Sequence, residues 1–533
     1  METRLTRCWI SNWPSYGLPA STLCRPSQQV LRILKRHDNE QNRGGGRVIY
    51  DSREDRFNEE CGVVGVYGRP EAANLAYLGL YSLQHRGQEG AGIASSDGSS
   101  LVQHRGLGLV ADVFDEDVIR ALGGDMAIGH NRYSTSGQTL LRNTQPFVVE
   151  YALGPLAVAH NGNFVNTELL RANLEAHGSI FQSTVDTEVL IHLIASYNRS
   201  TLLERTIDAL RVVEGAYSVL FMSDREMIAA RDPNGFRPMV IGRFEGGGYV
   251  VASETCALDL MEAEYVREVE PGELIHFRDG SMKSIHPFEK RERHACIFEH
   301  IYFARPDSMV FGTHVYGNRK EFGRQLAREA PVEADIVIPV PDSGVPAALG
   351  YAEESGIPFE MGLIRNHYVG RTFIEPQDSI RHFGVKVKLN PQREILAGKR
   401  VVIVDDSIVR GTTSRKIIRT IRAAGAREVH FRVSSPPTTG PCYYGVDTPT
   451  HGELVANNHS LEEIRQYILA DSLAYLSEAG MYSFLGGKDP GFCDACFTGR
   501  YPLGAAETAA GGQMHLFQSG DKKRGPRLRV VKE

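Results

Sequence analysis

The sequence predicts a two-domain protein that combines an α+β half with an α/β half. Residues 61–270 alternate short strands and turns with two helical patches, the pattern of an α+β domain. Residues 401–404 are an unbroken apolar, β-branched run, which is typical of a strand buried on both faces of a parallel sheet. At 533 residues, the chain is long enough for two to four domains.

Composition narrows the possible function classes. Charged residues of both signs are interspersed, and the formal net charge of −6 provides no basic surface for nucleic acid. No apolar stretch reaches the roughly 18 residues of a membrane span. Eight cysteines are too sparse for a disulfide framework in this chain and favour a reducing compartment. We therefore expect a cytoplasmic protein with no nucleic-acid or membrane partner.

The two ends of the chain are poor candidates for folded structure. We expect a leader over residues 1–60, because its first part scatters arginines among polar residues with few acids. The same composition suits an organelle transit peptide, which stays open as the alternative. Residues 503–533 are expected to form a solvated tail. Between these ends we expect a first domain over residues 61–290 and a second over residues 291–502.

Three segments define the predicted elements of the first half. Residues 63–66 begin an apolar strand. Another strand, residues 156–159, leads into Asn161-Gly162, the commonest sequence signal for a two-residue hairpin turn. Residues 183–188 have the signature of a helix N-terminus, with a Ser or Thr as cap and Asp186 near the positive end of the helix.

Cys61 is the candidate nucleophile of this half. It follows an Asn-Glu-Glu run, and cleavage after Glu60 would give it a free α-amine beside its thiol. An α-amine ordinarily has a pKa of about 7.7–8.0, so it could act as the general base for its own residue's sulfur. The alternative is a small buried cysteine that starts a strand.

This half, from Cys61 to about Glu270, resembles the glutaminase domain of the class II glutamine amidotransferases, which are N-terminal nucleophile hydrolases. The resemblance includes four segments, residues 84–92, 130–135, 160–163 and 186–188. The resemblance implies an αββα sandwich and glutamine as the substrate. It also implies these roles: Cys61 as catalytic nucleophile, Asn161 and Gly162 as the oxyanion hole, and Arg132, Thr135 and Asp186 as glutamine-binding residues.

The second half contains a predicted β-α-β unit. After the strand at residues 401–404 come two acids, Asp405 and Asp406, and then a small-residue turn. The turn opens a helix whose Ile417, Ile418 and Ile421 share a face and which Gly425 can end, and a further strand covers residues 429–433. A helix start rich in Ser, Thr and Gly presents free backbone N–H groups to a phosphate, whereas the acids suit ribose hydroxyls and Mg²⁺.

Residues 401–413 resemble the substrate motif of the type I phosphoribosyltransferases, which bind phosphoribosyl pyrophosphate (PRPP). The resemblance implies a parallel-sheet α/β domain. It also implies that the strand at residues 334–340 ends in a pyrophosphate loop containing Ser343, and that residues 365–373 close over the substrate. The implied PRPP residues are Asp405, Asp406, Ser407, Arg410, Gly411, Thr412, Thr413 and Arg371, and the implied Mg²⁺ residues are Ser343, Asp405 and Asp406.

Four cysteines lie in the second half. Cys493 and Cys496 form a C-x-x-C pair, and Cys296 and Cys442 precede them. Four thiols suit either a tetrahedral zinc ion or a [4Fe-4S] cluster. Their contexts at residues 296–308, 441–447 and 493–499 resemble the iron–sulfur branch of the amidophosphoribosyltransferase family. That resemblance implies that these four cysteines hold a structural [4Fe-4S] cluster.

The combined resemblance covers residues 59–502 and implies the first committed step of purine biosynthesis. Glutamine would be hydrolysed at Cys61, and the ammonia would displace pyrophosphate from PRPP to give 5-phosphoribosylamine. The family further implies one Mg²⁺ per subunit, inhibition by purine nucleotides and a homotetramer. Other class II amidotransferases carry a different second half, which the Asp405-Asp406 motif excludes. A regulator that binds PRPP and nucleic acid is the other alternative, and the absence of a basic surface argues against it.

Overall fold

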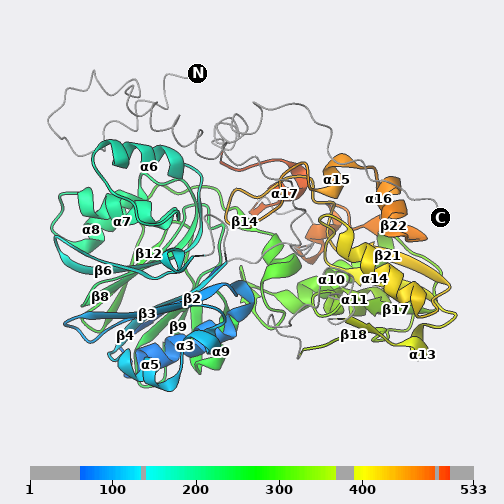
Figure 1. Ribbon diagram of the computed structural model, residues 1–533, viewed down its shortest axis with the longest axis horizontal. Coiled ribbons are helices and arrows are strands. Elements are labelled where there is room, and N and C mark those ends of the chain that lie inside the picture. Colours follow the sequence, from blue (N-terminus) through cyan, green and yellow to red (C-terminus); the bar gives the residue numbers. More distant parts are fainter. Residues whose placement is uncertain (1–60, 134–139, 368–388, 486–490, 504–533) are drawn as a thin grey trace, which may run out of the picture.

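The computed structural model describes residues 61–133, 140–367, 389–485 and 491–503. Two bodies lie side by side, one built around two antiparallel sheets and the other around a parallel sheet (Figure 1). Thr135 and Arg371, the leader and the tail from residue 504 lie outside the described residues. Among the described residues, no helix is long and apolar enough to cross a membrane.

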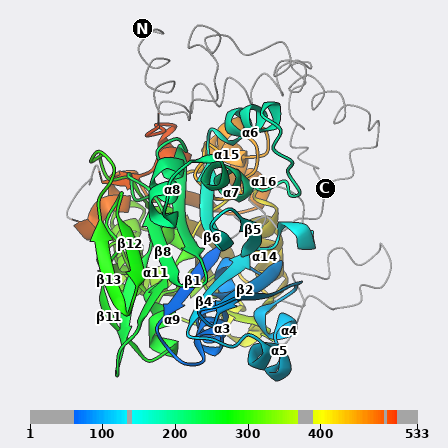
Figure 2. The same cartoon turned by 90° about the vertical axis from the view of Figure 1, so that its left-hand side faces the viewer.

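The first body consists of four layers, as the αββα prediction requires (Figure 2). One sheet has the strand order β11 (Ala263–Glu268), β9 (Val240–Phe244), β10 (Tyr249–Ala252), β1 (Gly62–Tyr67), β4 (Met126–Arg132), β2 (Gly90–Ser96), β3 (Leu101–Leu107). The other has the order β13 (Ser281–Ile285), β12 (Leu274–Arg278), β8 (Glu226–Arg231), β7 (Gly215–Met222), β6 (Gly154–Phe164), β5 (Phe147–Tyr151).

Helices cover the outer face of each sheet. The β1 sheet packs on α3 (Ala72–Ser82), α4 (Val110–Val113), α5 (Glu116–Ala121) and α9 (Thr255–Leu260). The β6 sheet packs on α6 (Thr167–Ala176), α7 (Thr187–Ser196) and α8 (Leu202–Leu210). Strand β1 is buried on both faces, because Val64 and Val66 contact helices while Val63 and Tyr67 lie in the core between the sheets.

The second body has a parallel sheet in the order β17 (Ile336–Pro339), β20 (Arg400–Asp405), β21 (Glu428–Val433), β22 (Ser472–Tyr475). Helices α10 (Val315–Glu329) and α11 (Val345–Ser355) cover one face, and α14 (Thr412–Ala423) and α16 (Leu461–Ile468) cover the other. The predicted β-α-β unit is therefore β20-α14-β21. Ile417, Ile418 and Ile421 of α14 are all buried against the sheet, as their helical spacing predicts.

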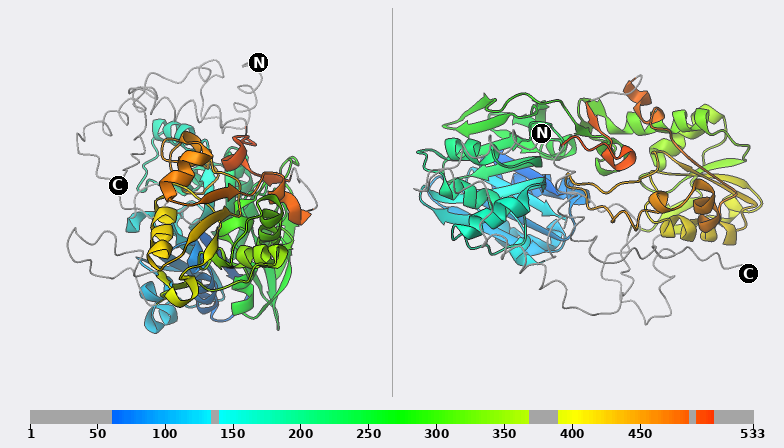
Figure 3. Two further views of the ribbon diagram at one scale, coloured as in Figure 1. Left: turned by 90° about the vertical axis from the view of Figure 1, so that its right-hand side faces the viewer. Right: turned by 90° about the horizontal axis from the view of Figure 1, so that it is seen from above.

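Short elements complete the second body and its junction with the first. These are β14 (Ala295–Cys296) paired with β23 (Phe492–Cys493), β15 (Met309–Val310) with β16 (Thr313–His314), β18 (Leu363–Arg365) with β19 (Leu389–Pro391), α13 (Arg393–Leu396), α15 (Val455–Asn458) and α17 (Ala495–Thr498). Short helical segments cover Gln84–Arg86, Leu141–Asn143, Glu299–Phe303 and Gly480–Leu485. Seen from above, the β14 and α17 region lies beside the first body (Figure 3).

Two local predictions in the first half are wrong. Asn161-Gly162 does not turn the chain, because β6 continues through both residues to Phe164 and pairs with β7 along that length. Neither Ser183 nor Thr184 caps α7, which begins at Thr187 after Asp186. Ser183 instead donates its hydroxyl and backbone N–H to the Glu188 carboxylate, at 2.6 and 2.7 Å.

Candidate functional site

Cys61 and Arg132 lie at the start of β1 and the end of β4, two neighbouring antiparallel strands. Only 7% of Cys61 is exposed, and its thiol donates to the Tyr133 carbonyl oxygen at 3.4 Å. Arg132 is 2% exposed and donates to the Asn143 carbonyl oxygen at 2.7 Å. Burial lowers the pKa of Arg132, and the Cys61 thiol opposes that shift together with two acids, Glu89 and Asp186. The thiol, the guanidinium and both acids therefore share one region.

Asp186 approaches this region from the other sheet. It stands just before α7, but its carboxylate accepts a hydrogen bond from the Phe164 backbone N–H of β6 at 3.0 Å instead of capping its own helix. Burial raises the pKa of Asp186, but the charge and hydrogen bonding of His160 and the backbone donors outweigh that effect and lower it. A buried carboxylate is thus held charged, as a partner for an ammonium group must be.

Asn161 and Gly162 lie within β6, beside the Phe164 that Asp186 binds. The Asn161 side chain is 1% exposed, and neither its amide nitrogen nor its amide oxygen has a hydrogen-bond partner among the described residues. Gly162 has φ +146°, and a Cβ there would lie 2.0 Å from the Ala216 carbonyl oxygen. Only glycine fits at this position. A buried, unpaired donor next to an obligatory glycine is typical of an anion-stabilising site.

The second candidate site lies at the carboxyl end of the parallel sheet. Asp405 ends β20 and, with Asp406, is more than 90% buried. The Asp406 backbone N–H donates to the Asp405 carboxylate at 3.0 Å, and the Ser407 hydroxyl donates to Asp406 at 2.6 Å. Gly411 follows with φ +77°, immediately before α14. The start of α14 presents Thr412 and Thr413 at the same end of the sheet.

The loop containing Ser343 reaches the same edge. Strands β17 and β20 are parallel neighbours, and the Val340 N–H donates to the Val404 carbonyl oxygen at 2.8 Å. This bond joins the starts of both substrate loops. Arg410 donates to Glu453 at 3.1 Å. The structure thus brings together the predicted PRPP and Mg²⁺ residues at one sheet edge, apart from Arg371, which lies outside the described residues.

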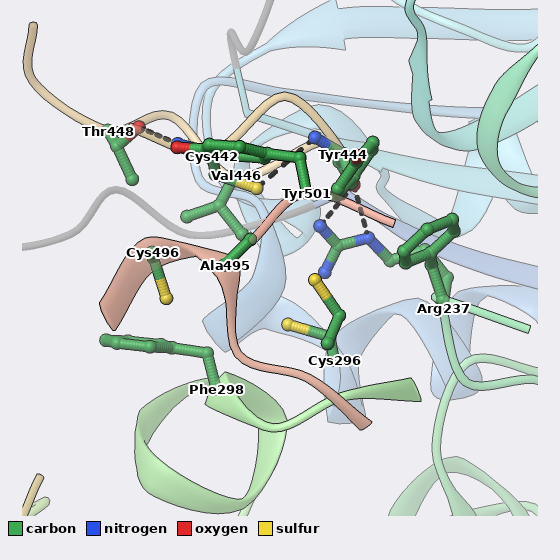
Figure 4. Close-up of a pocket in the computed structure, with 12 residues that line it drawn as sticks. Arg237, Cys296, Phe298, Cys442, Tyr444, Val446, Thr448, Ala495, Cys496 and Tyr501 are labelled. Carbon is green, nitrogen blue, oxygen red and sulfur yellow. Dashed lines mark hydrogen bonds between the residues drawn. The ribbon is translucent and has the colours of Figure 1, made fainter. Parts of the chain in front are cut away.

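The four predicted cluster cysteines line one pocket (Figure 4). Burial raises the pKa of Cys493 to about 12, and burial also raises the pKa of Cys496 well above its usual value, with a contribution from the other three thiols. Aromatic side chains surround the sulfurs, among them Phe298 and Tyr501. Four mutually close thiols in an apolar pocket suit a cationic metal centre, because coordination stabilises the thiolate that burial disfavours.

The described residues around the pocket do not contain a preformed metal site. In the described part of the chain, no group of three or more His, Cys, Asp or Glu side chains is arranged to hold one metal ion.

Buried charges at the contact between the two bodies were missed by sequence reasoning. Arg86 pairs with Glu254 of the first body and with Glu299 of the second, where its Nη2 lies 2.5 Å from the carboxylate. Arg237 is 3.7 Å from Glu299 and donates to the Tyr444 carbonyl oxygen at 2.9 Å. No local pattern marks these residues, because each partner lies far away in the sequence. Arg86 stands within the matched segment at residues 84–92, yet that match implies no role for it.

Comparison with known proteins accounts for both bodies. Residues 130–260 match the family model of a glutamine amidotransferase domain. Residues 319–445 match the family model of a phosphoribosyl transferase domain. Amidophosphoribosyltransferase 1, chloroplastic, of Arabidopsis thaliana is 56% identical over 458 residues, which are 86% of this chain and 81% of that protein. The Bacillus subtilis amidophosphoribosyltransferase is 52% identical over 451 residues, 84% of this chain and 94% of that protein.

The chain belongs to the amidophosphoribosyltransferase family. A solved structure of glutamine PRPP amidotransferase from B. subtilis, complexed with ADP and GMP, superimposes with a TM-score of 0.79 at 52% identity, covering 83% of this chain and 97% of that one. As an amidophosphoribosyltransferase, the chain is a glutamine-dependent PRPP amidotransferase of purine biosynthesis, and both domains of that enzyme are present. The predictions of family, two-domain fold and enzyme class are confirmed.

Proposed function

We propose that Cys61, released as the N-terminal residue by cleavage after Glu60, attacks the glutamine amide. The supporting observations are the closeness of the Cys61 thiol to the buried Arg132 guanidinium, and the unpaired Asn161 amide on β6, the strand whose Phe164 N–H binds Asp186. Arg132 binds the glutamine carboxylate through two parallel hydrogen bonds, and Asp186 binds the ammonium. Asn161 and the Gly162 N–H stabilise the developing oxyanion, and Thr135 supports the carboxylate.

In the second domain, we propose that residues 405–413 bind PRPP. The backbone N–H groups and hydroxyls at the start of α14 hold the 5′-phosphate, and Asp405 and Asp406 hold the ribose hydroxyls. Ser343, Asp405 and Asp406 are hard oxygen ligands that fit Mg²⁺. When bound, this ion neutralises charge on the pyrophosphate leaving group. Arg371 completes the proposed set.

We further propose that Cys296, Cys442, Cys493 and Cys496 hold a [4Fe-4S] cluster with a structural role. The shared pocket, the mutual closeness of the four thiols and their sequence contexts support it. The ADP and GMP in the B. subtilis structure support inhibition by purine nucleotides. A homotetramer and the boundaries 61–290 and 291–502 remain our proposals.

The compartment is also a proposal. The cysteine content favours a reducing environment, and several plant relatives are chloroplastic by name. A plastid transit peptide within residues 1–60 is therefore an alternative to a cytoplasmic enzyme. The location of a reporter fused to those residues decides between them.

Variants at each site test the assignment of two reactions to two domains. Cys61→Ala, expressed so that this position becomes the N-terminus, should lose glutamine-dependent phosphoribosylamine synthesis and keep synthesis from ammonium at high pH. Asp405→Asn with Asp406→Asn should lose synthesis from both nitrogen sources and keep basal glutamine hydrolysis. Loss of both syntheses in a folded Cys61→Ala protein would contradict the proposal. If N-terminal sequencing of active enzyme still shows residues before Cys61, the proposed cleavage after Glu60 is wrong.

A further inference from the structure

One loop of the second domain lies between the cysteine pocket and the oxyanion strand. Residues 442–446 contribute Cys442, Tyr444 and Val446 to the lining of the pocket. The other side of this loop faces β6. A Cβ at Gly445 would lie 3.0 Å from the Cα and the carbonyl carbon of Gly162, so the two backbones are already in close contact.

Hydrogen bonds fix this loop on the first domain from two sides. The Asn163 side-chain amide of β6 donates to the Tyr443 carbonyl oxygen at 3.0 Å. The Arg237 guanidinium donates to the next carbonyl oxygen, that of Tyr444, at 2.9 Å (Figure 4). The Tyr444 ring stacks on Phe236 with centroids 4.4 Å apart. Three consecutive loop residues, Tyr443 to Gly445, thus contact the first domain.

Gly162 is held between two backbones that leave it no room. On one side its missing side chain faces the Ala216 carbonyl oxygen of β7, and on the other it meets Gly445. The position of Gly162 therefore depends on the position of the loop. Asn163, the next residue along β6, is half-buried, and its amide bond to Tyr443 ties the strand to that same loop.

We propose that Asn163 is a positioning residue of the glutamine site, which fixes the oxyanion-hole N–H of Gly162 by tying β6 to the Tyr443–Gly445 loop of the second domain. The inference rests on the proposed oxyanion role of Asn161 and Gly162. Asn163 acts through the backbone of its neighbour and touches neither substrate. Its contribution is to the transition state, because the oxyanion forms only there.

Asn163→Asp and Asn163→Ala test this role, with Asn166→Asp as the matched control. Asn166 lies three residues further along, and its amide also donates to a backbone carbonyl, that of Val212, at 2.9 Å. That partner belongs to the first domain. Asn163→Asp replaces a donor to Tyr443 with a repelling oxygen, while Asn166→Asp makes the same change away from the loop.

We expect both Asn163 variants to lower kcat for glutamine-dependent synthesis by about 10- to 100-fold, since a misplacement of 1 Å costs on the order of 100-fold. The KM for glutamine, ammonium-dependent synthesis and the iron and sulfide content should stay at parental values. The Asn166→Asp enzyme should match the parent in all of these. The same kcat in the Asn163 and Asn166 variants, or a parallel loss of ammonium-dependent synthesis, would overturn the proposal. Asn161→Ala is measured alongside to test the oxyanion assignment separately. If Asn161→Ala keeps glutamine turnover, the oxyanion assignment is wrong, whatever the Asn163 variants show.

Discussion

Asn161 offers a prediction in which activity and stability move in different directions. Its amide is 1% exposed, with no hydrogen-bond partner among the described residues. An unpaired buried polar group costs about 1–3 kcal/mol of folding free energy. Asn161→Ala removes that cost along with some packing, so the thermal midpoint should be unchanged or higher.

The same substitution should severely impair glutamine chemistry. Loss of one oxyanion donor lowers kcat by about 100- to 1000-fold, or about 2.7–4 kcal/mol of transition-state stabilisation. Ammonium-dependent synthesis should be unaffected, because PRPP binds in the other domain. The assay compares both nitrogen sources and the thermal midpoint for each purified variant.

Asn131→Ala is the matched control for a buried asparagine with a structural bond. Asn131 lies on β4, and its amide donates to the Leu80 carbonyl oxygen at 2.7 Å. Its loss should lower the thermal midpoint without a selective loss of glutamine turnover. If Asn161→Ala instead lowers the midpoint and both syntheses together, Asn161 is a structural residue and the reasoning is wrong.

Three further predictions concern Glu188, Arg132 and Cys493. Burial raises the pKa of Glu188, but hydrogen bonds from His192 and from residues 182–183 lower it from 4.5 to about 2 overall. The charged carboxylate therefore contributes up to about 3 kcal/mol to the unfolding free energy. This contribution is complete above about pH 4.5 and is lost as the pH falls towards 2. The difference in unfolding free energy between Glu188→Gln and the parent should therefore shrink over that range. A difference that stays constant would contradict this role of the Glu188 carboxylate. Arg132→Ala should raise the KM for glutamine by about 10- to 100-fold, as expected for a lost charge-assisted hydrogen bond, and an equal effect on ammonium-dependent turnover would exclude a carboxylate-binding role. Anaerobically purified parent protein should contain iron and sulfide that Cys493→Ser lacks, and stoichiometric zinc without iron would refute the cluster.

The sequence predicted the second domain more closely than the first. Residues 401–404 are apolar on both faces, so they could only be a central strand, and the spacing of Ile417, Ile418 and Ile421 identified the buried face of α14. In the first domain, polar residues interrupt the pattern. Asn161-Gly162 has the composition of a turn, yet the ladder with β7 keeps both residues in a strand. Tertiary pairing overrode a local preference at the proposed oxyanion hole.

The contacts between the domains could not be predicted from local sequence, and they bear most directly on how the two reactions are linked. Arg86 and Glu299 are 213 positions apart, and Asn163 and Tyr443 are 280 apart. Neither pair follows from periodicity, capping or turn composition. Both residues of the Arg86–Glu299 pair are buried. Removal of one partner would leave the other charge buried and unpaired, which would lower the unfolding free energy by about 3–5 kcal/mol. Such a pair tolerates little separation of the domains. We therefore propose that β6 and the cysteine-bearing loop remain in contact, and that the geometry of the glutamine site depends on residues of the domain that consumes its ammonia.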